Sequence, residues 1–334
     1  MDISLPRPWA DPAWFDQVRA WIEASLEARG QGLVSLDPPR IRPWSVVMRL
    51  QASAGPCFFK APAPASIYEA GLSQALLRHR PGVMPALLAV DAARGWMLMA
   101  DGGETLRARL QSDRDLSYWL RLLPDYATLQ RDMAGHVDEM LALGVPDRRL
   151  ARLPALYAGL LADTDDLRLG QPDGLSQAEH RRLLDLRPRV ADMAAELASY
   201  GLPETIQHDD FHDGNIFVHD GRYQFFDWGD ACITHPFCTM LVSLRSTAAR
   251  FDLPTTAPEL ARLRDAYLAP WSASAPPHHL LAAADLAQRL GALCRVLSWQ
   301  SALAGAAEPD RAPHQEAVPG WLQEFLAITE AVQP

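Results

Sequence analysis

The octet HDDFHDGN, at residues 208–215, is the stretch that decides the fold. Acids and imidazoles supply five of its eight side chains. A loop rich in Asp, Gly and Asn can be an ordinary solvated turn. Two chemical interpretations compete with that one. The octet could be a nest of His and Asp ligands for a transition metal, or a loop that holds one base and one magnesium ligand for phosphoryl transfer.

The segment that follows favours phosphoryl transfer. NIFVH (215–219) and YQFFD (223–227) flank the turn HDGR and predict a β-hairpin. The octet therefore lies in the loop that leads into this hairpin. Its His, Asp and Asn residues have the spacing of the kinase signature H-R-D-L-x-x-x-N, and DWG at 227–229 supplies the D-x-G that follows.

Composition draws attention to two residues far apart in the chain. The basic residues are 30 arginines and one lysine, Lys60, and the chain has one asparagine, Asn215. Lys60 lies in CFFKA (57–61), which reads as a strand rich in aromatic residues. Glu69 is the only acid in the helix predicted at 65–79. A strand lysine followed by a helical carboxylate is the pair that phosphoryl transfer from ATP requires.

Periodicity divides the chain into a small sheet and a large helical part. The chain has 334 residues, 49% of them hydrophobic, which is enough for two lobes. We predict an α+β fold with a nucleotide-binding lobe at 1–100, containing an N-terminal helix, and a catalytic and substrate-binding lobe at 101–334. Strands are expected at 34–36, 44–50, 57–61, 86–91 and 96–100, with a hairpin around SAG. Helices are expected at 11–29, 65–79, 104–111, 116–143 in one or two pieces, 149–162, 176–200, 236–249, 257–269, 279–304 and 315–331.

Two stretches, QHDDFHDGNIFV and YQFFDWGDACITHP, resemble the aminoglycoside phosphotransferase and choline kinase group of kinase-like small-molecule phosphotransferases. That group shows an H-x-D-x-H-x-x-N loop followed by a D-W/F-x-D segment. The resemblance extends over the layout from about residue 34 to 245 and implies a protein-kinase-like bilobal fold. The chain departs from the group in THPFCTM, where His235 and Thr239 replace residues of a G-D-P and a further Asp. Asp209 stands where many relatives have Gly.

The resemblance implies a set of roles, with ATP and Mg²⁺ as cofactors. Asp210 would be the catalytic base, Asn215 and Asp227 would hold magnesium, and Lys60, fixed by Glu69, would grip the nucleotide phosphates. The further candidates are Ser45 and Met99 as ATP contacts, His208 as a brace of the loop, His212 as a loop-orienting or phosphate-contacting residue, and Asp230 as a substrate contact.

Other residues near the motif are expected to be less important. We expect Asp209 to turn outward as a solvated side chain and Asp213 to be a surface acid. Trp299 and Trp321 could line an acceptor pocket, although tryptophans in helices are usually core residues. The acceptor is expected to be a hydroxylated small molecule, such as an aminoglycoside, choline or another alcohol, and its identity is open.

Two alternative functions remain. The fold could bind nucleotide without transferring phosphate, or His208 and His212 with Asp209 or Asp210 could form the site of a metal hydrolase. The net charge of -10 argues against nucleic acid as a partner. No signal peptide or membrane span is expected, and four cysteines without a CxxC pair favour the reduced cytoplasm. The oligomeric state is not predicted.

Overall fold

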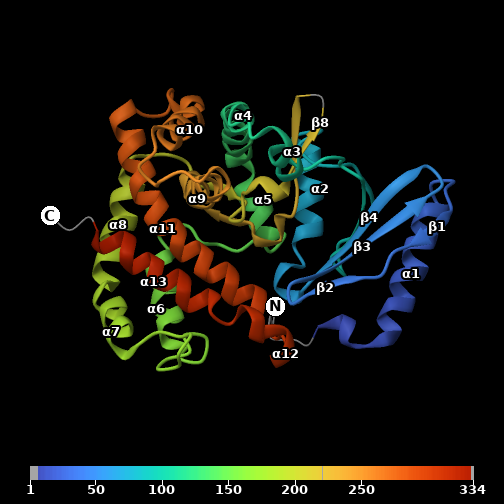
Figure 1. Cartoon of the computed structure of the whole chain (residues 1–334), viewed down its shortest axis with the longest axis horizontal. Coiled ribbons are helices and arrows are strands. Elements are labelled where there is room, and N and C mark those ends of the chain that lie inside the picture. The colour runs from blue at the N-terminus through green and yellow to red at the C-terminus, as the bar shows by residue number, and fades with distance from the viewer. Residues whose placement is uncertain (1–6, 220, 332–334) are drawn as a thin grey trace.

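The computed structural model describes residues 7–219 and 221–331, and its first part is built around an antiparallel sheet. Figure 1 shows this sheet at one end of the molecule, with most helices at the other. The strands run in the order β1-β3-β4-β6-β5, and β2 pairs with β3. Their bounds are β1 Leu33–Leu36, β2 Arg40–Arg42, β3 Ser45–Ala52, β4 Gly55–Pro62, β5 Leu87–Asp91 and β6 Trp96–Ala100. The predicted β3–β4 hairpin is confirmed, and only the short, exposed β2 was not predicted.

Lys60 lies in the middle of this sheet, because β4 pairs with β3 on one side and β6 on the other. It stands opposite Val47 in β3 and Met97 in β6. One face of the sheet is covered by α1 (Pro12–Glu27), whose N-terminus is capped by the Asp11 side chain. Trp14 of α1 meets Trp96 edge to face, with ring centroids 5.9 Å apart. The strand that holds Lys60 is therefore paired on both edges within a sheet that α1 covers.

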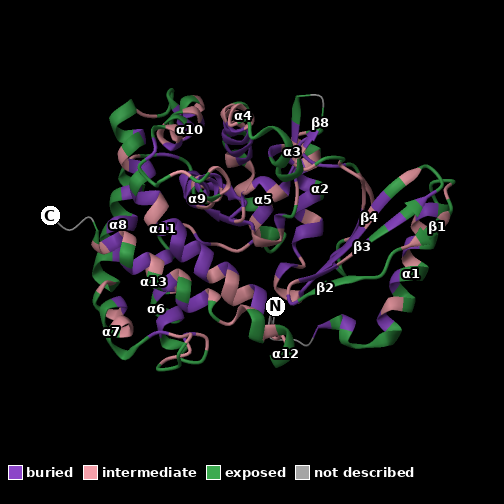
Figure 2. Cartoon of the chain, viewed as in Figure 1, coloured by how far each residue is buried: buried purple, intermediate pink, exposed green. Residues whose placement is uncertain are grey.

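The second helix of this part, α2 (Glu69–His79), begins four residues later than predicted. Pro64–Ser66 forms a short 3₁₀ helix instead of the first helical turn. Leu72 and Leu76 of α2 are buried in the same core as the later helices. Figure 2 shows this buried side of α2 facing the helical part. Glu69 thus stands at the start of a helix that joins the sheet to the rest of the chain.

The remainder of the chain is mostly helical. The predicted helix at 176–200 is divided at Leu186, because Pro188 favours the first turn of a new helix over the interior of an old one. The helices are α3 Leu106–Asp113, α4 Ser117–Met133, α5 Val137–Ala142, α6 Leu153–Ala162, α7 Gln177–Asp185, α8 Arg187–Ser199, α9 Met240–Phe251, α10 Pro258–Leu268, α11 Pro277–Leu303, α12 Glu308–Arg311 and α13 Ala317–Glu330.

Two small strand pairs interrupt the helices and hold the motif. The predicted hairpin is β8 (Ile216–His219) with β9 (Arg222–Phe225). A second pair, β7 (Thr205–Gln207) with β10 (Cys232–Thr234), was not predicted, since each strand has only three residues. The octet connects β7 to β8, and the DWG segment connects β9 to β10. The two motif loops therefore leave from paired strands.

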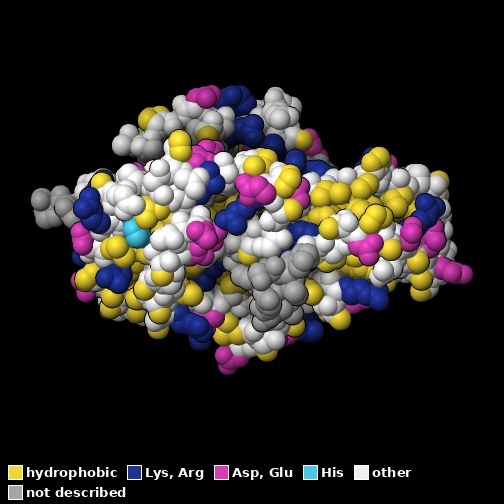
Figure 3. All heavy atoms as spheres, turned by 90° about the horizontal axis from the view of Figure 1, so that it is seen from below, with side chains coloured by type: hydrophobic (Ala, Val, Ile, Leu, Met, Phe, Trp, Pro, Cys, Tyr) yellow, Lys and Arg dark blue, Asp and Glu magenta, His cyan; other side chains and the backbone are white. Residues whose placement is uncertain are grey.

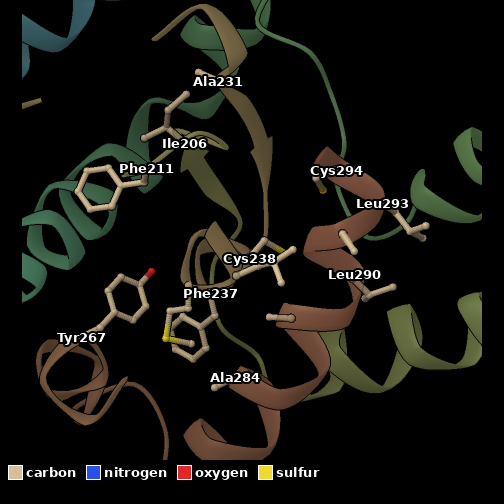
Figure 4. Close-up of a cluster of buried hydrophobic side chains, with 14 of the residues drawn as sticks. Ile206, Phe211, Ala231, Phe237, Cys238, Tyr267, Ala284, Leu290, Leu293 and Cys294 are labelled. Atoms are coloured by element: carbon tan, nitrogen blue, oxygen red, sulfur yellow. The ribbon is translucent and has the colours of Figure 1, made fainter. Parts of the chain in front are cut away.

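Helix α11 packs closely beneath these loops. A Cβ on Gly291 would lie only 2.9 Å from the backbone oxygen of Cys238, so a larger residue would push the helix away. Figure 4 shows Cys238 and Phe237 on the loop that faces this helix, and Cys294 on the helix itself. The close approach matters because the next two turns of α11 carry side chains that contact the octet.

The cysteines and the surface agree with an ordinary globular chain. All four cysteines are buried free thiols. None of the described helices combines the length and apolarity needed to cross a bilayer. On the face seen in Figure 3, basic and acidic side chains are intermixed and form no continuous basic stripe.

Candidate active site

The sole lysine forms the centre of an ion-pair cluster in which Lys60 and Glu69 are buried and Asp227 is half exposed. Lys60 Nζ lies 2.6 Å from Glu69 Oε1 and 2.5 Å from Asp227 Oδ1. The sequence placed these three residues on a strand, on a helix and after a hairpin, and the structure brings them together. Lys60 is thereby held at the junction between the sheet and the helical part, with its charge matched by two carboxylates.

The charges in this cluster depend on one another. Burial would lower the pKa of Lys60, but Asp227 and Glu69 outweigh it and hold that pKa above its usual range. Burial raises the pKa of Glu69 to about 7 despite the nearby lysine. For Asp227 the balance is reversed: burial acts upward, and Lys60 brings the pKa below its usual value. Asp227 also has a left-handed backbone with φ of 65°, which is uncommon for a residue other than glycine.

Asp210 faces the same space from the octet. Asn215 donates its side-chain N–H to the backbone oxygen of Asp210 at 3.0 Å, which closes the loop and directs the amide oxygen away. His212 Nδ1 accepts a hydrogen bond from the Gly214 N–H at 2.9 Å. The proton of a neutral His212 must therefore lie on Nε2, which is 3.3 Å from Asp210 Oδ2. His212 thus supports Asp210.

The other histidine of the octet, His208, holds the loop in place through buried contacts. His208 is fully buried, and its Nε2 donates to the backbone oxygen of Phe226 at 2.8 Å. Its backbone N–H donates to the Tyr126 hydroxyl, and Tyr126 stacks on Phe211 with ring centroids 3.9 Å apart. Burial lowers the pKa of His208. These contacts are those of a neutral bracing residue.

A residue that the sequence did not indicate, Arg295 of α11, meets Asp210 directly. Its Nη2 is 2.8 Å from Asp210 Oδ1, and its Nη1 is 2.7 Å from Asp230 Oδ2. The guanidinium carbon also lies 5.4 Å from the ring centre of Trp299. Burial would raise the pKa of Asp210, but Arg295 and a hydrogen bond with His212 hold it well below its usual range. An arginine within the apolar run GALCRVLSW was the available signal.

Asp209 contradicts the expectation of a solvated side chain. It is buried, accepts from Gln207 at 2.7 Å and lies 3.3 Å from Arg148 Nη1. The Ser298 hydroxyl donates to it as well. Its backbone has φ of 60°, a conformation that costs a residue with a Cβ more than it costs glycine. The buried partners explain how an aspartate is tolerated at this position.

The proton balance of Asp209 should make stability depend on pH. Burial raises its pKa to about 7, although Arg148 opposes the rise. The folded chain then keeps a proton that the unfolded chain releases at lower pH, so stability should fall as pH rises through this window. We expect Asp209→Asn to flatten the decline of the urea midpoint between about pH 4 and 7. The exposed Asp265→Asn is the control, and an unchanged slope in Asp209→Asn would contradict the assignment.

Asp213 is likewise not the surface acid that was expected. It is buried, with Arg107 Nε at 2.9 Å from one carboxylate oxygen and Arg250 Nε at 2.8 Å from the other. These arginines belong to α3 and α9, so Asp213 ties the end of the octet to two helices. Its role in the fold is to fix the end of the octet to these two helices.

Two cavities meet at this cluster. The larger, about 480 Å³, lies between the sheet and the octet and is lined by Met99, Lys60, Asn215 and Asp227 among others. The smaller, about 110 Å³, is lined by Asp210, Asp230, Arg295, Trp44 and Trp299 together with Lys60 and Asp227.

The predicted ATP contact Ser45 is buried in β3 and lines neither cavity. Trp321 lies elsewhere, over Arg245.

The interpretation of the octet as a metal nest does not fit these positions. His208 Nε2 is used by Phe226, and His212 Nδ1 by Gly214. Within residues 7–219 and 221–331, the three-ligand group of histidine and carboxylate atoms is formed by other residues, not by the octet. The geometry of this loop therefore gives the metal-hydrolase alternative no support.

In THPFCTM, the two residues that differ from those of the related group, His235 and Thr239, form local hydrogen bonds. His235 Nδ1 accepts from the Phe237 N–H at 3.3 Å and caps the following 3₁₀ helix. The Thr239 hydroxyl meets the Tyr126 hydroxyl at 3.3 Å. Burial lowers the pKa of His235 to about 3, so this cap is uncharged. The segment is thus braced through side chains other than the family's usual acid.

A strand lysine paired with a helical glutamate, facing a loop of the H-x-D-x-H-x-x-N type, defines a kinase-like phosphotransferase fold. The sequence model of the phosphotransferase enzyme family matches residues 40–277, and the chain belongs to this family. A search of curated proteins finds no match.

Solved structures confirm the predicted protein-kinase-like fold. A choline kinase from Cryptosporidium parvum Iowa II is similar with a TM-score of 0.63 at 11% identity, over 95% of this chain and 96% of that one. An ethanolamine kinase from Plasmodium vivax gives 0.61 at 12%, over 90% and 83%. The ADP-bound aminoglycoside phosphotransferase APH(2'')-Ib gives 0.54 at 13%, over 95% and 99%. At these identities the likeness concerns the fold alone.

Proposed function

We propose that this protein is an ATP- and Mg²⁺-dependent kinase that moves the γ-phosphate to a hydroxyl of a small molecule. The observation that carries the proposal is the convergence of Lys60, Glu69, Asp227, Asn215 and Asp210 around two adjoining cavities. Residues 1–100 would form the nucleotide-binding lobe and 101–334 the catalytic and acceptor lobe. ATP would occupy the larger cavity against Met99, and the acceptor would enter beside Asp210.

The donor set suits magnesium. Mg²⁺ prefers a few oxygen ligands and keeps several waters. Asp227 is half exposed toward the cavities, and one carboxylate oxygen remains beyond the one that meets Lys60. The amide nitrogen of Asn215 is used by Asp210, which leaves the amide oxygen for a cation. Asn215 and Asp227 would thus hold the ion, whose charge would offset that of the transferring phosphate.

The chain's own residues would divide the remaining work. Lys60 would draw the nucleotide phosphates toward the sheet while Glu69 keeps its side chain extended. Asp210 would accept a hydrogen bond from the acceptor hydroxyl and orient it. A carboxylate whose pKa is held low by Arg295 is a weak base, so orientation suits it better than early proton removal. This is compatible with a loose transition state, in which the proton leaves late.

Arg295 bears on which acceptors fit. Both acids that could bind an amine beside the reacting hydroxyl, Asp210 and Asp230, are already paired with this arginine. Its guanidinium also lies over the ring of Trp299. A cationic acceptor would have to displace a buried guanidinium. We therefore expect transfer to the uncharged tert-butyl analogue of choline to exceed transfer to choline by about tenfold in kcat/KM. A preference for choline would contradict this role of Arg295.

A phosphate-transfer screen tests the proposed function. ATP consumption is measured with amino sugars, macrolides, choline, its uncharged analogue and simple sugars, and products are identified by mass. We expect at least one acceptor to gain a phosphate, with the reaction lost on chelation of Mg²⁺. Nucleotide binding is measured separately by thermal shift. Binding without transfer to any member of a broad panel would favour the alternative of a silent nucleotide-binding protein.

A further inference from the structure

A second cluster of metal-binding side chains lies away from the active-site residues. His79 ends α2, His136 precedes α5, and Glu139 lies in the first turn of α5. Their ligand atoms all lie within 4.8 Å of one another. Glu139 Oε2 is 2.8 Å from His79 Nε2 and 3.9 Å from His136 Nδ1. The imidazole rings stack, with centroids 3.6 Å apart and planes inclined by 23°.

These separations match the needs of a tetrahedral ion. Two imidazole nitrogens and one carboxylate oxygen form a zinc ligand set, and bonds of about 2.1 Å place ligand atoms roughly 3.4 Å apart. The observed values of 2.8 and 3.9 Å lie on either side of this spacing. His136 and Glu139 are three residues apart across one helical turn, while His79 comes from a distant segment. Because the two rings now stack, one imidazole must rotate out of the stack before both nitrogens can bind the same ion.

The neighbouring charges leave the site accessible. Arg78 also pairs with Glu139, but through Oε1, the oxygen that does not face the imidazoles. Arg78 is largely exposed, and an exposed ion pair contributes little to stability. The two histidines and Glu139 are each partly exposed, so an ion can enter from solvent and keep a water as its fourth ligand.

We propose that His79 Nε2, His136 Nδ1 and Glu139 Oε2 bind one Zn²⁺ or a similar transition-metal ion. The ion would join the end of α2 to α5. Helix α2 begins with Glu69, the partner of Lys60, so the ion would fix the helix that orients this pair. The proposal does not depend on phosphate transfer, because the cluster stands on its own ligands. It adds a site distinct from the magnesium ligands Asn215 and Asp227.

Zinc titration by calorimetry tests the site. The protein is stripped with a chelator, returned to buffer with excess Mg²⁺ to occupy other carboxylates, and titrated with zinc sulfate. We expect one site per chain, and binding weaker by more than about tenfold in His79→Ala and in His136→Ala. His278→Ala removes an exposed histidine from α11 and should bind as the wild type does. No binding, or equal binding in all four proteins, would overturn the proposal.

A second measurement guards against misfolding of the variants. Circular dichroism should show the same spectrum for all proteins without zinc. Zinc should raise the melting temperature of the wild type and of His278→Ala, but not of the other two variants, because ligand binding to the folded state stabilises it. Co²⁺ in place of zinc should give a tetrahedral visible spectrum that Glu139→Gln alters. A zinc shift that persists in His79→Ala and His136→Ala would overturn the site.

Discussion

Asp210→Asn is expected to lower kcat by about 10³-fold, because the variant keeps the size of the side chain and loses the negative charge of the carboxylate proposed to orient the acceptor hydroxyl. The nucleotide should still bind with nearly the wild-type affinity. Lys60, Asp227 and Met99 line the larger cavity, and Asp210 lines only the smaller one. The measurements are steady-state transfer to an acceptor from the screen and ADP binding by calorimetry.

The control for this prediction is Asp265→Asn, which alters an exposed aspartate on α10 and should leave both quantities unchanged. Arg295 remains paired with Asp230 in the Asp210 variant, so the fold should be retained. Near-normal transfer by Asp210→Asn would remove Asp210 from the mechanism. Loss of nucleotide binding together with transfer would instead indicate a change in the loop's structure.

Lys60→Met is expected to have the second large effect, on both binding and stability. The variant leaves Glu69 and Asp227 close together at the site of a missing cation. Removing one partner of a buried pair costs about 3–5 kcal/mol, of which protonation of Glu69 would recover a part. The nucleotide phosphates would also lose their point charge. We expect a lower urea midpoint, weaker ADP binding and transfer reduced by about 10²-fold or more.

A double variant separates the two effects. Lys60→Met with Glu69→Gln neutralises Glu69, the more buried of the two carboxylates left without a cation, and should recover much of the lost stability, since neutral groups cost less to bury than unpaired charges. Transfer should stay low, because no cation returns to the phosphates. Recovery of transfer in the double variant would show that Lys60 serves only the fold.

The fold could be predicted wherever a local signal was long or strong. The β3–β4 hairpin and helix α11 follow from periodicity and turn residues over many positions. The pair β7–β10 was missed, because strands of three residues gain their stability from partners distant in the chain. The start of α2 at Glu69 was also missed, since the competing 3₁₀ helix at Pro64–Ser66 depends on tertiary contacts such as Ser66 Oγ with Gly229 O, 2.7 Å apart.

The residues of the candidate site were likewise predicted only where the sequence carries a local signal. Lys60, Asp210 and Asp227 were found because spacing and rarity in the sequence single them out. Arg295 was missed because it lies 85 residues beyond Asp210 on a helix with no motif of its own. Asp209 was misjudged, since its burial depends on Arg148 from another segment, and nothing near either residue in the sequence connects them. Local sequence patterns thus identified the residues proposed for the chemistry. The protonation states of these residues depend on contacts with segments that are distant in the sequence.

The most direct measurement of the central claim follows the γ-phosphate of labelled ATP. The wild type is incubated with Mg²⁺ and the best acceptor of the screen, and the label is traced by mass and by ³¹P resonance. We expect label on a hydroxyl of the acceptor in the wild type and almost none in Asp210→Asn, with both proteins binding ADP. Equal labelling by the two proteins would contradict it.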